Sequence, residues 1–257
     1  MLSINEERTV ERIEEWMQKI FRKANFTKAV LGLSGGIDSA VVAYLAVRAL
    51  GKDNVYCVKM PYRTSNPQSV KDADRMIELL GVRSMTVDIS PAVDAFSESL
   101  NDVSPARLGN IMARCRMITL FDLSAGLEAL VLGTSNKTER LLGYGTLHGD
   151  LASSVNPLGD LYKTQVWALA KYLGIPQDII DKKPSADLVE GQTDEKDFGF
   201  TYRQADDVLD AILDEKHSKL DTINLGYTMD QIDEVLNRVE HNKYKAEIPY
   251  IFQLRVV

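Results

Sequence analysis

The first half of the chain alternates short apolar runs with longer segments in which apolar residues recur every three or four positions. The short runs have the length of buried strands, and the longer segments have the period of helices with one buried face. Strands that alternate with helices pair in parallel through right-handed crossovers. The pattern therefore predicts an α/β fold, a doubly wound parallel sheet with helices on both faces, with strands at residues 29–33, 54–60, 84–89 and 128–133.

Helix-end signals mark the connecting segments. Asn66 and Pro67 suit the cap and first position of a helix that Gly81 ends, and Gly51 ends the helix before the second strand. Further helices are predicted at residues 5–23, 38–50, 92–100, 106–125, 161–173, 204–217 and 229–239.

Two long segments lack a regular period. Residues 142–160 are rich in glycine and predict a loop, and residues 183–199 are polar and expected to be mobile. Loops of this length inside compact domains are usually functional. Because no linker or repeat interrupts the pattern, residues 1–257 are predicted to form one domain.

Composition narrows the functional class. The chain holds 37 acidic and 30 basic residues, a formal net charge of -7, which argues against a protein that binds nucleic acid through many phosphate contacts. No run approaches the roughly 18 apolar residues that span a bilayer, and the charged N-terminus lacks the features of a secretion signal. Cys57 and Cys115 lie in separate apolar stretches without disulfide or metal-site spacing. A cytoplasmic protein without membrane or nucleic-acid partners is expected.

The turn after the first strand carries the clearest chemical signal. Gly35 and Gly36 let backbone N–H groups approach an anion, and the following helix adds its positive N-terminal end. Open α/β sheets bind ligands at this edge. Ser34 and Ser39 add hydroxyl donors, and Asp38 suits Mg²⁺, which takes one or two carboxylates plus phosphate oxygens. The alternative interpretation is a tight turn in which Asp38 and Ser39 only cap the helix.

Residues 32–39 (GLSGGIDS) resemble the pyrophosphate loop of the ATP pyrophosphatases, enzymes of the adenine nucleotide alpha hydrolase-like fold that cleave ATP to AMP and pyrophosphate. Four further segments resemble the NAD synthetase family: residues 132–139, 159–166, 183–186 and 191–195. The resemblance implies ATP-dependent amidation of deamido-NAD to NAD through an adenylated acyl intermediate. With no room for a glutaminase domain, free ammonia is the expected nitrogen donor.

The resemblance also implies roles for individual residues. The implied ATP-binding residues are Gly32, Leu33, Ser34, Gly35, Gly36, Ile37, Asp38, Ser39, Met60, Thr134, Lys163 and Ser185. Asp38 and Glu139 are the implied Mg²⁺ ligands, and Asp38 and Lys163 the implied catalytic residues. The implied contacts to deamido-NAD are Arg114, Tyr244 and Lys245.

Several of these residues also have a purely structural interpretation. Thr134 suits a helix cap, and Glu139 suits a first-turn helix acid. Lys163 is harder to explain in this way, since a cation near a helix N-terminus opposes the helix dipole. Arg114 and Arg116 lie two positions apart on a predicted helix and so face different ways, which leaves a surface charge as the simpler interpretation of one of them.

Three positions depart from the family's frequent pattern on the acyl-substrate side. Leu147 stands where a lysine is usual, Ser154 where an acid is usual, and Tyr244 where a histidine is usual. These departures leave open a non-catalytic nucleotide-binding protein. The nearest enzymatic alternative is another ATP pyrophosphatase, such as a tRNA-modifying enzyme.

The resemblance also implies a homodimer, with residues 5–23 and 112–123 as candidate interface helices.

Overall fold

A parallel sheet lies at the centre of the molecule. The computed structural model describes residues 2–185, 193–246 and 252, and its strands are β1 (Lys28–Gly32), β2 (Val55–Lys59), β3 (Arg83–Thr86) and β4 (Ala129–Val131). The strand order is β3-β2-β1-β4, and every pairing is parallel. The chain builds outward from β1 to β3 and then returns to the other side of β1, so the topological switch point lies between β1 and β4.

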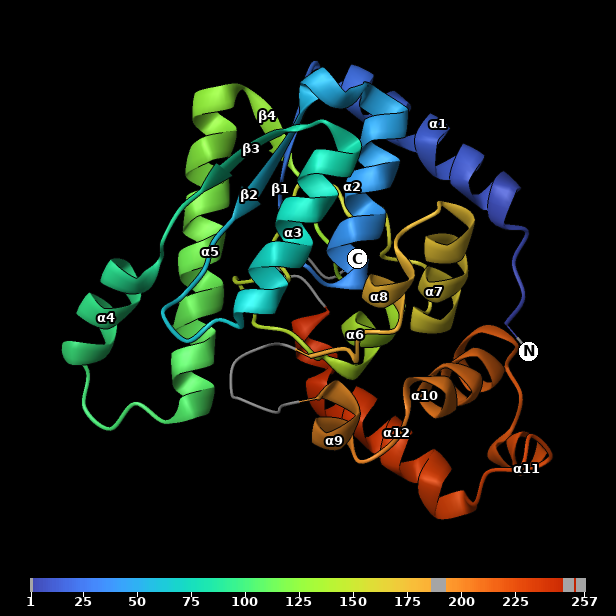
Figure 1. The fold of residues 1–257 in the computed structure, drawn as a ribbon. Coiled ribbons are helices and arrows are strands. Elements are labelled where there is room, and N and C mark those ends of the chain that lie inside the picture. The colour runs from blue at the N-terminus through green and yellow to red at the C-terminus, as the bar shows by residue number, and fades with distance from the viewer. Residues whose placement is uncertain (1, 186–192, 247–251, 253–257) are drawn as a thin grey trace.

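Helices cover both faces of this sheet (Figure 1). Ala29 and Leu31 of β1 pack in one apolar cluster, whereas Val30 between them packs in another, because successive side chains of a strand point to opposite faces. The first cluster is covered by α1 (Glu6–Ala24), α2 (Ile37–Leu50), α3 (Pro67–Leu80) and α7 (Lys163–Tyr172), and the second by α4 (Ser90–Glu98) and α5 (Pro105–Leu127). The predicted doubly wound fold is confirmed.

Helix ends in this half follow the sequence signals. The Asn66 side chain accepts a hydrogen bond from the backbone N–H of Gln68, Pro67 is the first residue of α3, and Gly81 ends the helix in the left-handed region at φ 60°. Gly51 ends α2 at a positive φ of 82° and a ψ of 145°, and its backbone N–H donates to the Val47 carbonyl oxygen. Caps of this kind satisfy backbone groups that a helix end leaves unpaired.

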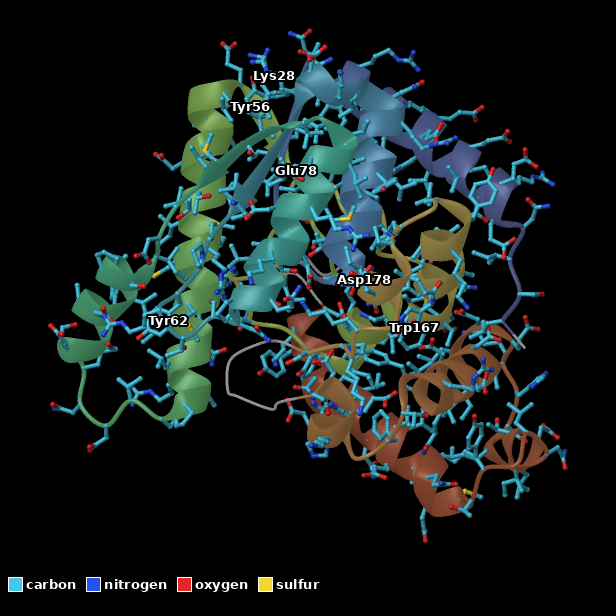
Figure 2. The ribbon with its side chains drawn as sticks, viewed as in Figure 1. Lys28, Tyr56, Tyr62, Glu78, Trp167 and Asp178 are labelled. Carbon is cyan, nitrogen blue, oxygen red and sulfur yellow. The ribbon has the colours of Figure 1, made fainter. Side chains whose placement is uncertain are left out.

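The C-terminal half is mostly helical and shares a third apolar cluster. It comprises α6 (Lys137–Leu142), α8 (Gln177–Ile180), α9 (Asp194–Phe198), α10 (Tyr202–Leu209), a π-helical turn (Asp210–Asp214), α11 (Lys219–Ile223), α12 (Met229–Asn242) and a short 3₁₀ turn at Lys243–Lys245, while another 3₁₀ turn, Lys52–Asn54, precedes β2. The helix α8 packs in the sheet cluster, whereas side chains from α6, α9, α10, the π-helical turn and α12 form the third cluster. Trp167 of α7 packs against both this cluster and the sheet cluster (Figure 2). Its ring meets that of Tyr202 edge-on, with centroids 5.9 Å apart.

Here the structure differs from the prediction in several places, among them the short helix α8, which was not predicted. The helix predicted at residues 204–217 begins at Tyr202 and changes to a π-helical turn at Asp210. The short helix α11 was not predicted, because five residues are too few for a periodic pattern. The helix α9 lies in the polar segment 183–199, where Phe198 is its buried apolar anchor. Residues 186–192 of that segment lie outside the described residues, so its expected mobility stays a prediction.

Residues 143–160 form the predicted loop between α6 and α7, attached to β4 through a parallel bridge between Leu132 and Val155. Cys57 and Cys115 are buried free thiols. Within residues 2–185, 193–246 and 252, no helix combines the length and apolar character needed to cross a membrane. That residues 1–257 form one domain stays a prediction.

Candidate active site

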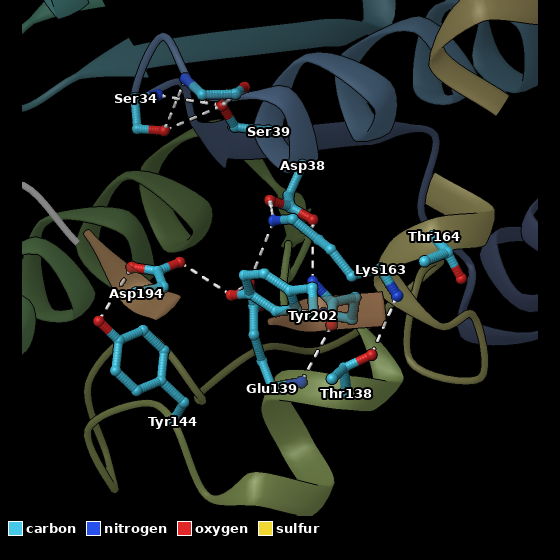
Figure 3. A network of polar contacts seen from close by, with 12 residues as sticks. Ser34, Asp38, Ser39, Thr138, Glu139, Tyr144, Lys163, Thr164, Asp194 and Tyr202 are labelled. Atoms are coloured by element: carbon cyan, nitrogen blue, oxygen red, sulfur yellow. Dashed lines mark hydrogen bonds and ion pairs between the residues drawn. The ribbon is translucent and has the colours of Figure 1, made fainter. Parts of the chain in front are cut away.

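Asp38, Glu139 and Lys163 meet beyond the carboxyl edge of the sheet (Figure 3). Asp38 is the second residue of α2, Glu139 the third of α6 and Lys163 the first of α7. The Lys163 ammonium pairs with the Asp38 carboxylate and lies 3.4 Å from Oε1 of Glu139. Three residues singled out from the sequence are thus brought together, although they come from three separate helix starts.

The Lys163 ammonium is withdrawn from water, since its side chain is 1% exposed. Burial alone lowers the pKa of Lys163, but the Asp38 and Glu139 carboxylates outweigh burial and raise it. Burial, together with the negative charge of Asp38, raises the pKa of Glu139 to about 8, against the opposing effect of Lys163. Two acids therefore share one ammonium, and the site favours an additional positive charge.

The loop before α6 explains how Glu139 is held. Asn136 caps α6, and its Oδ1 accepts a hydrogen bond from the Glu139 N–H at 3.0 Å, while Glu139 Oε2 accepts from the Asn136 N–H at 3.3 Å. Asn136 Nδ2 also donates to Asp38 Oδ1 at 3.0 Å. Glu139 is therefore both a first-turn helix acid and a member of the charged cluster. Thr134, which follows β4, is not the cap, because Asn136 occupies that position.

A buried carboxylate fixes the start of α7. Asp206 accepts hydrogen bonds from the Thr138 hydroxyl and, at 2.8 Å, from the Thr164 N–H. The Thr138 hydroxyl in turn accepts from the Lys163 N–H at 3.0 Å. An acid at a helix N-terminus complements the dipole, which offsets the unfavourable Lys163 cation there. Because Thr138 precedes Glu139 and Thr164 follows Lys163, one carboxylate positions both helix starts.

The glycine turn is closed by its own serine hydroxyls. The Ser34 N–H donates to Ser39 Oγ at 3.2 Å, and the Gly36 N–H donates to Ser34 Oγ at 3.2 Å. Ser39 Oγ donates to the Gly36 carbonyl at 3.0 Å. Gly35 lies at φ +77°, and a Cβ added there would lie 2.1 Å from the Ser69 carbonyl oxygen, so the position requires glycine. Backbone N–H and hydroxyl groups grouped at a helix N-terminus form an arrangement that binds phosphate.

The sequence did not reveal a bridge of two tyrosines and an aspartate beside this centre. The Tyr202 hydroxyl donates to Asp194 Oδ2 at 2.8 Å and lies 3.4 Å from Glu139 Oε1. The Tyr144 hydroxyl donates to Asp194 Oδ1 at 2.9 Å. Burial raises the pKa of both tyrosines, so their hydroxyls stay protonated as donors. Asp194 lies in the family-like segment 191–195, but no spacing marked either tyrosine.

Arg114 and Arg116 hold backbone carbonyls in two different parts of the site. Arg114 donates through Nε and Nη2 to the Leu147 carbonyl oxygen at 3.3 and 3.2 Å. Arg116 donates through Nε to the Met60 carbonyl oxygen at 3.1 Å. The predicted divergence of the two side chains is confirmed, and each of them holds a backbone carbonyl in a different segment.

The remaining candidates lie around the glycine-rich loop or at the edge of the site. Lys245 donates to the carbonyl oxygens of Gly143 and Gly145, at 2.8 and 3.2 Å, and so lies against the loop rather than between Asp38 and Glu139. Tyr244 is 51% exposed, and Ser185 is exposed in the segment that follows α8.

The donor set at the centre fits Mg²⁺. Asp38 and Glu139 offer carboxylate oxygens, the ligands that Mg²⁺ prefers, and they already enclose the Lys163 ammonium. Across the described part of the chain, no group of three or more His, Cys, Asp and Glu side chains forms a metal site by itself. Two carboxylates suffice where substrate phosphates supply the other ligands.

An open parallel sheet with a phosphate-type turn and a carboxylate–lysine centre at its switch point defines a nucleotide-binding α/β protein. The chain belongs to the NAD synthase family, whose sequence model, described as NAD synthase, matches residues 9–249.

Individual relatives are similar to this chain over most of its length. The NH(3)-dependent NAD(+) synthetase of Chlorobium phaeobacteroides strain BS1 is 53% identical over 233 residues, which are 91% of this chain and 84% of the relative. The structure is similar to NMN synthetase from Francisella tularensis, with a TM-score of 0.88 and 31% identity over 98% of this chain and 100% of the other. It is also similar to the NH3-dependent NAD synthetase from Campylobacter jejuni, with a TM-score of 0.83 and 36% identity over 97% and 100% of the chains.

Asp206 predicts a pH dependence of stability. Burial raises the pKa of Asp206 from its ordinary 3.8 to about 6. The folded protein therefore keeps the proton of Asp206 at pH values where the unfolded chain has lost it. The carboxyl group favours folding most below about pH 4, and this contribution is lost as the pH rises through about 6. The amide side chain of the D206N variant does not titrate. We expect the free energy of unfolding of the wild type relative to D206N to fall by about 2 kcal/mol between about pH 4 and pH 7.

Denaturant unfolding of both proteins across this pH range measures the difference. D160N, which removes a carboxylate that is 97% exposed, controls for the loss of one charge and should change by only a few tenths of a kcal/mol. A difference between wild type and D206N that stays constant with pH contradicts the assignment.

Proposed function

We propose that this chain amidates deamido-NAD to NAD with ammonia and ATP at the site around Lys163. The reaction is that of an ammonia-dependent NAD⁺ synthetase, a C–N ligase of NAD biosynthesis. The observation that supports the placement of the chemistry is the convergence of Asp38 and Glu139 on the Lys163 ammonium, at the sheet edge where the glycine turn lies.

ATP is proposed to bind across the turn and the centre. Residues 32–39 face its phosphates with the N–H and hydroxyl donors that now bind one another. The backbone at Met60 meets the adenine, and Thr134, Lys163 and Ser185 complete the ATP contacts. Asp38 and Glu139 are the proposed Mg²⁺ ligands, and the bound metal neutralises charge on the phosphates.

The proposed reaction has two steps. An oxygen of the nicotinate carboxylate attacks the α-phosphorus of ATP, the bond from that phosphorus to pyrophosphate breaks, and an adenylated acyl intermediate forms. Ammonia then attacks the acyl carbon, the nitrogen loses a proton, and AMP leaves. The Lys163 ammonium stabilises the negative charge that develops on the departing pyrophosphate. The chain supplies no nucleophile, because the substrate carboxylate plays that part.

Deamido-NAD is proposed to lie along the glycine-rich loop. Arg114 and Lys245 approach the loop from α5 and from the end of the described chain, and both side chains donate to loop carbonyls. Together with Tyr244, they form the proposed binding surface for the dinucleotide.

Replacement of Asp38 tests the proposed function. D38N keeps the side-chain shape but removes one carboxylate from the proposed Mg²⁺ and Lys163 site. We expect kcat/KM for AMP formation, measured with ATP, Mg²⁺, ammonia and deamido-NAD, to fall at least about a hundredfold. D178N, which removes a 59% exposed carboxylate paired with Arg75, should retain activity.

Three outcomes contradict the proposal. AMP formation that does not depend on deamido-NAD indicates another ATP pyrophosphatase. ATP binding without turnover indicates a nucleotide-binding protein. Productive use of glutamine in place of ammonia contradicts the expected nitrogen donor.

Leu147 allows a test of the acyl-substrate side. L147K restores the lysine that is frequent in the family, next to the carbonyl that Arg114 already holds. A cation there attracts a phosphate-bearing substrate, so we expect KM for deamido-NAD to fall by about fivefold with KM for ATP unchanged. H148K adds a lysine at the exposed neighbouring position and should have little effect. Equal effects of the two variants on KM for deamido-NAD contradict a specific role for position 147.

We also infer a homodimer. On α5, Ile118 is 55% and Phe121 is 38% exposed, and on α1 Trp16 is 41% exposed, so both helices proposed for the interface present large apolar side chains. Sedimentation equilibrium at micromolar concentration should give twice the chain mass, and a monomer contradicts the inference.

The cytoplasmic location stays a proposal that rests on the two free cysteines.

A further inference from the structure

Lys182 lies against the glycine turn, and neither the sequence patterns nor the proposed reaction gives it a role. Its Nζ donates to the Gly35 carbonyl oxygen at 3.3 Å, to Ser69 Oγ at 3.1 Å and to Asp72 Oδ2 at 2.7 Å. An ammonium group has three N–H donors, so these acceptors use all of them. Lys182 is therefore a fixed link between the turn and α3.

Asp72 keeps this ammonium in place. Its side chain is 9% exposed, and its other carboxylate oxygen accepts from Gln68 Nε2 at 2.8 Å. The Lys182 side chain is 29% exposed, so the pair is only partly withdrawn from water, and desolvation of Asp72 offsets much of the attraction between the two charges. The larger effect of the pair is on geometry, since both partners are held in a single arrangement. The pair connects the segment after α8, which leads to Ser185, with the first turns of α3.

The contact with Gly35 sets the orientation of the peptide between Gly35 and Gly36. In a trans peptide, the C=O and the following N–H point in opposite directions. Because the Gly35 carbonyl faces Lys182, the Gly36 N–H faces away from it, and it donates to Ser34 Oγ on the hydroxyl-lined side of the turn. A cation at the carbonyl oxygen also polarises the peptide and strengthens its N–H as a donor.

We propose that Lys182 is a positioning residue for ATP: it holds the Gly35–Gly36 peptide so that the Gly36 N–H faces the phosphates. This proposal rests on the proposed role of residues 32–39 in ATP binding. Lys182 acts through the backbone, and its ammonium needs no contact with the nucleotide.

K182Q is the principal test. Glutamine has two N–H donors and no charge, so it cannot reproduce the three contacts. We expect the Kd and KM for ATP to rise about tenfold, with KM for deamido-NAD unchanged and kcat within about threefold, as for a lost charged hydrogen bond. K171Q, which removes an exposed lysine of α7, should match the wild type.

The double variant K182Q/D72N distinguishes a positioning role of Lys182 from simple compensation of the Asp72 charge. K182Q alone leaves the buried Asp72 unpaired and can destabilise the fold, whereas the double variant removes both charges. We expect its ATP affinity to stay about tenfold weaker than that of D72N, at a thermal unfolding midpoint near that of D72N. Recovery of the D72N affinity in the double variant overturns the proposal, because the lysine then only balances a charge.

S34A distinguishes failure of this proposal from failure of the proposed ATP site. If S34A weakens ATP binding and K182Q does not, the turn binds ATP and the positioning role is wrong. If neither substitution changes ATP binding, the turn is not the phosphate site, and both proposals fail.

Discussion

The buried ammonium of Lys163 is the interaction on which the arrangement of the site depends. A cation that is 1% exposed persists only beside partners of opposite charge, and these partners come from α2 and α6. Removal of one partner from such a pair typically costs about 3–5 kcal/mol, because it leaves an uncompensated charge. Strand order makes the meeting possible, since parallel strands place the following helix starts at one edge of the sheet. The same edge holds the glycine turn.

The charges of this centre balance one another only in part. The remaining imbalance suits the centre to bind a further positive charge. Burial, together with the negative charge of Asp38, raises the pKa of Glu139 to about 8 against the opposing effect of Lys163, because one ammonium group does not compensate two buried carboxylates. In the proposed function, Mg²⁺ held by these two carboxylates would supply the missing positive charge. The whole chain has a net charge of -7, so attraction of a polyanion depends on local groups: Lys163, the N–H donors of the turn and the Mg²⁺ proposed to bind Asp38 and Glu139.

Whether a feature of the structure could be predicted from the sequence depends on how far apart along the chain its interacting residues lie. The strands of the sheet and the ends of α3 depend on local periodicity and caps, and the sequence predicted them. Asp38, Glu139 and Lys163 were found through motifs, and the structure brings them together. Tyr202 and Asp206 were not found, because their contacts with α6 and α7 arise only when α10 packs there. The π-helical turn after α10 leaves no periodic signal either.

The departures on the acyl side also have a physical explanation. Arg114 and Lys245 use their N–H groups on carbonyl oxygens of the loop, which every residue type presents. The shape of the loop is therefore set through its backbone, so the side chain at position 147 can vary without loss of that support. At the glycine turn and the charged centre, by contrast, Asp38 and Lys163 contact one another through their side chains, and Gly35 lies too close to Ser69 for a Cβ. Substitution is therefore more restricted there than along the loop.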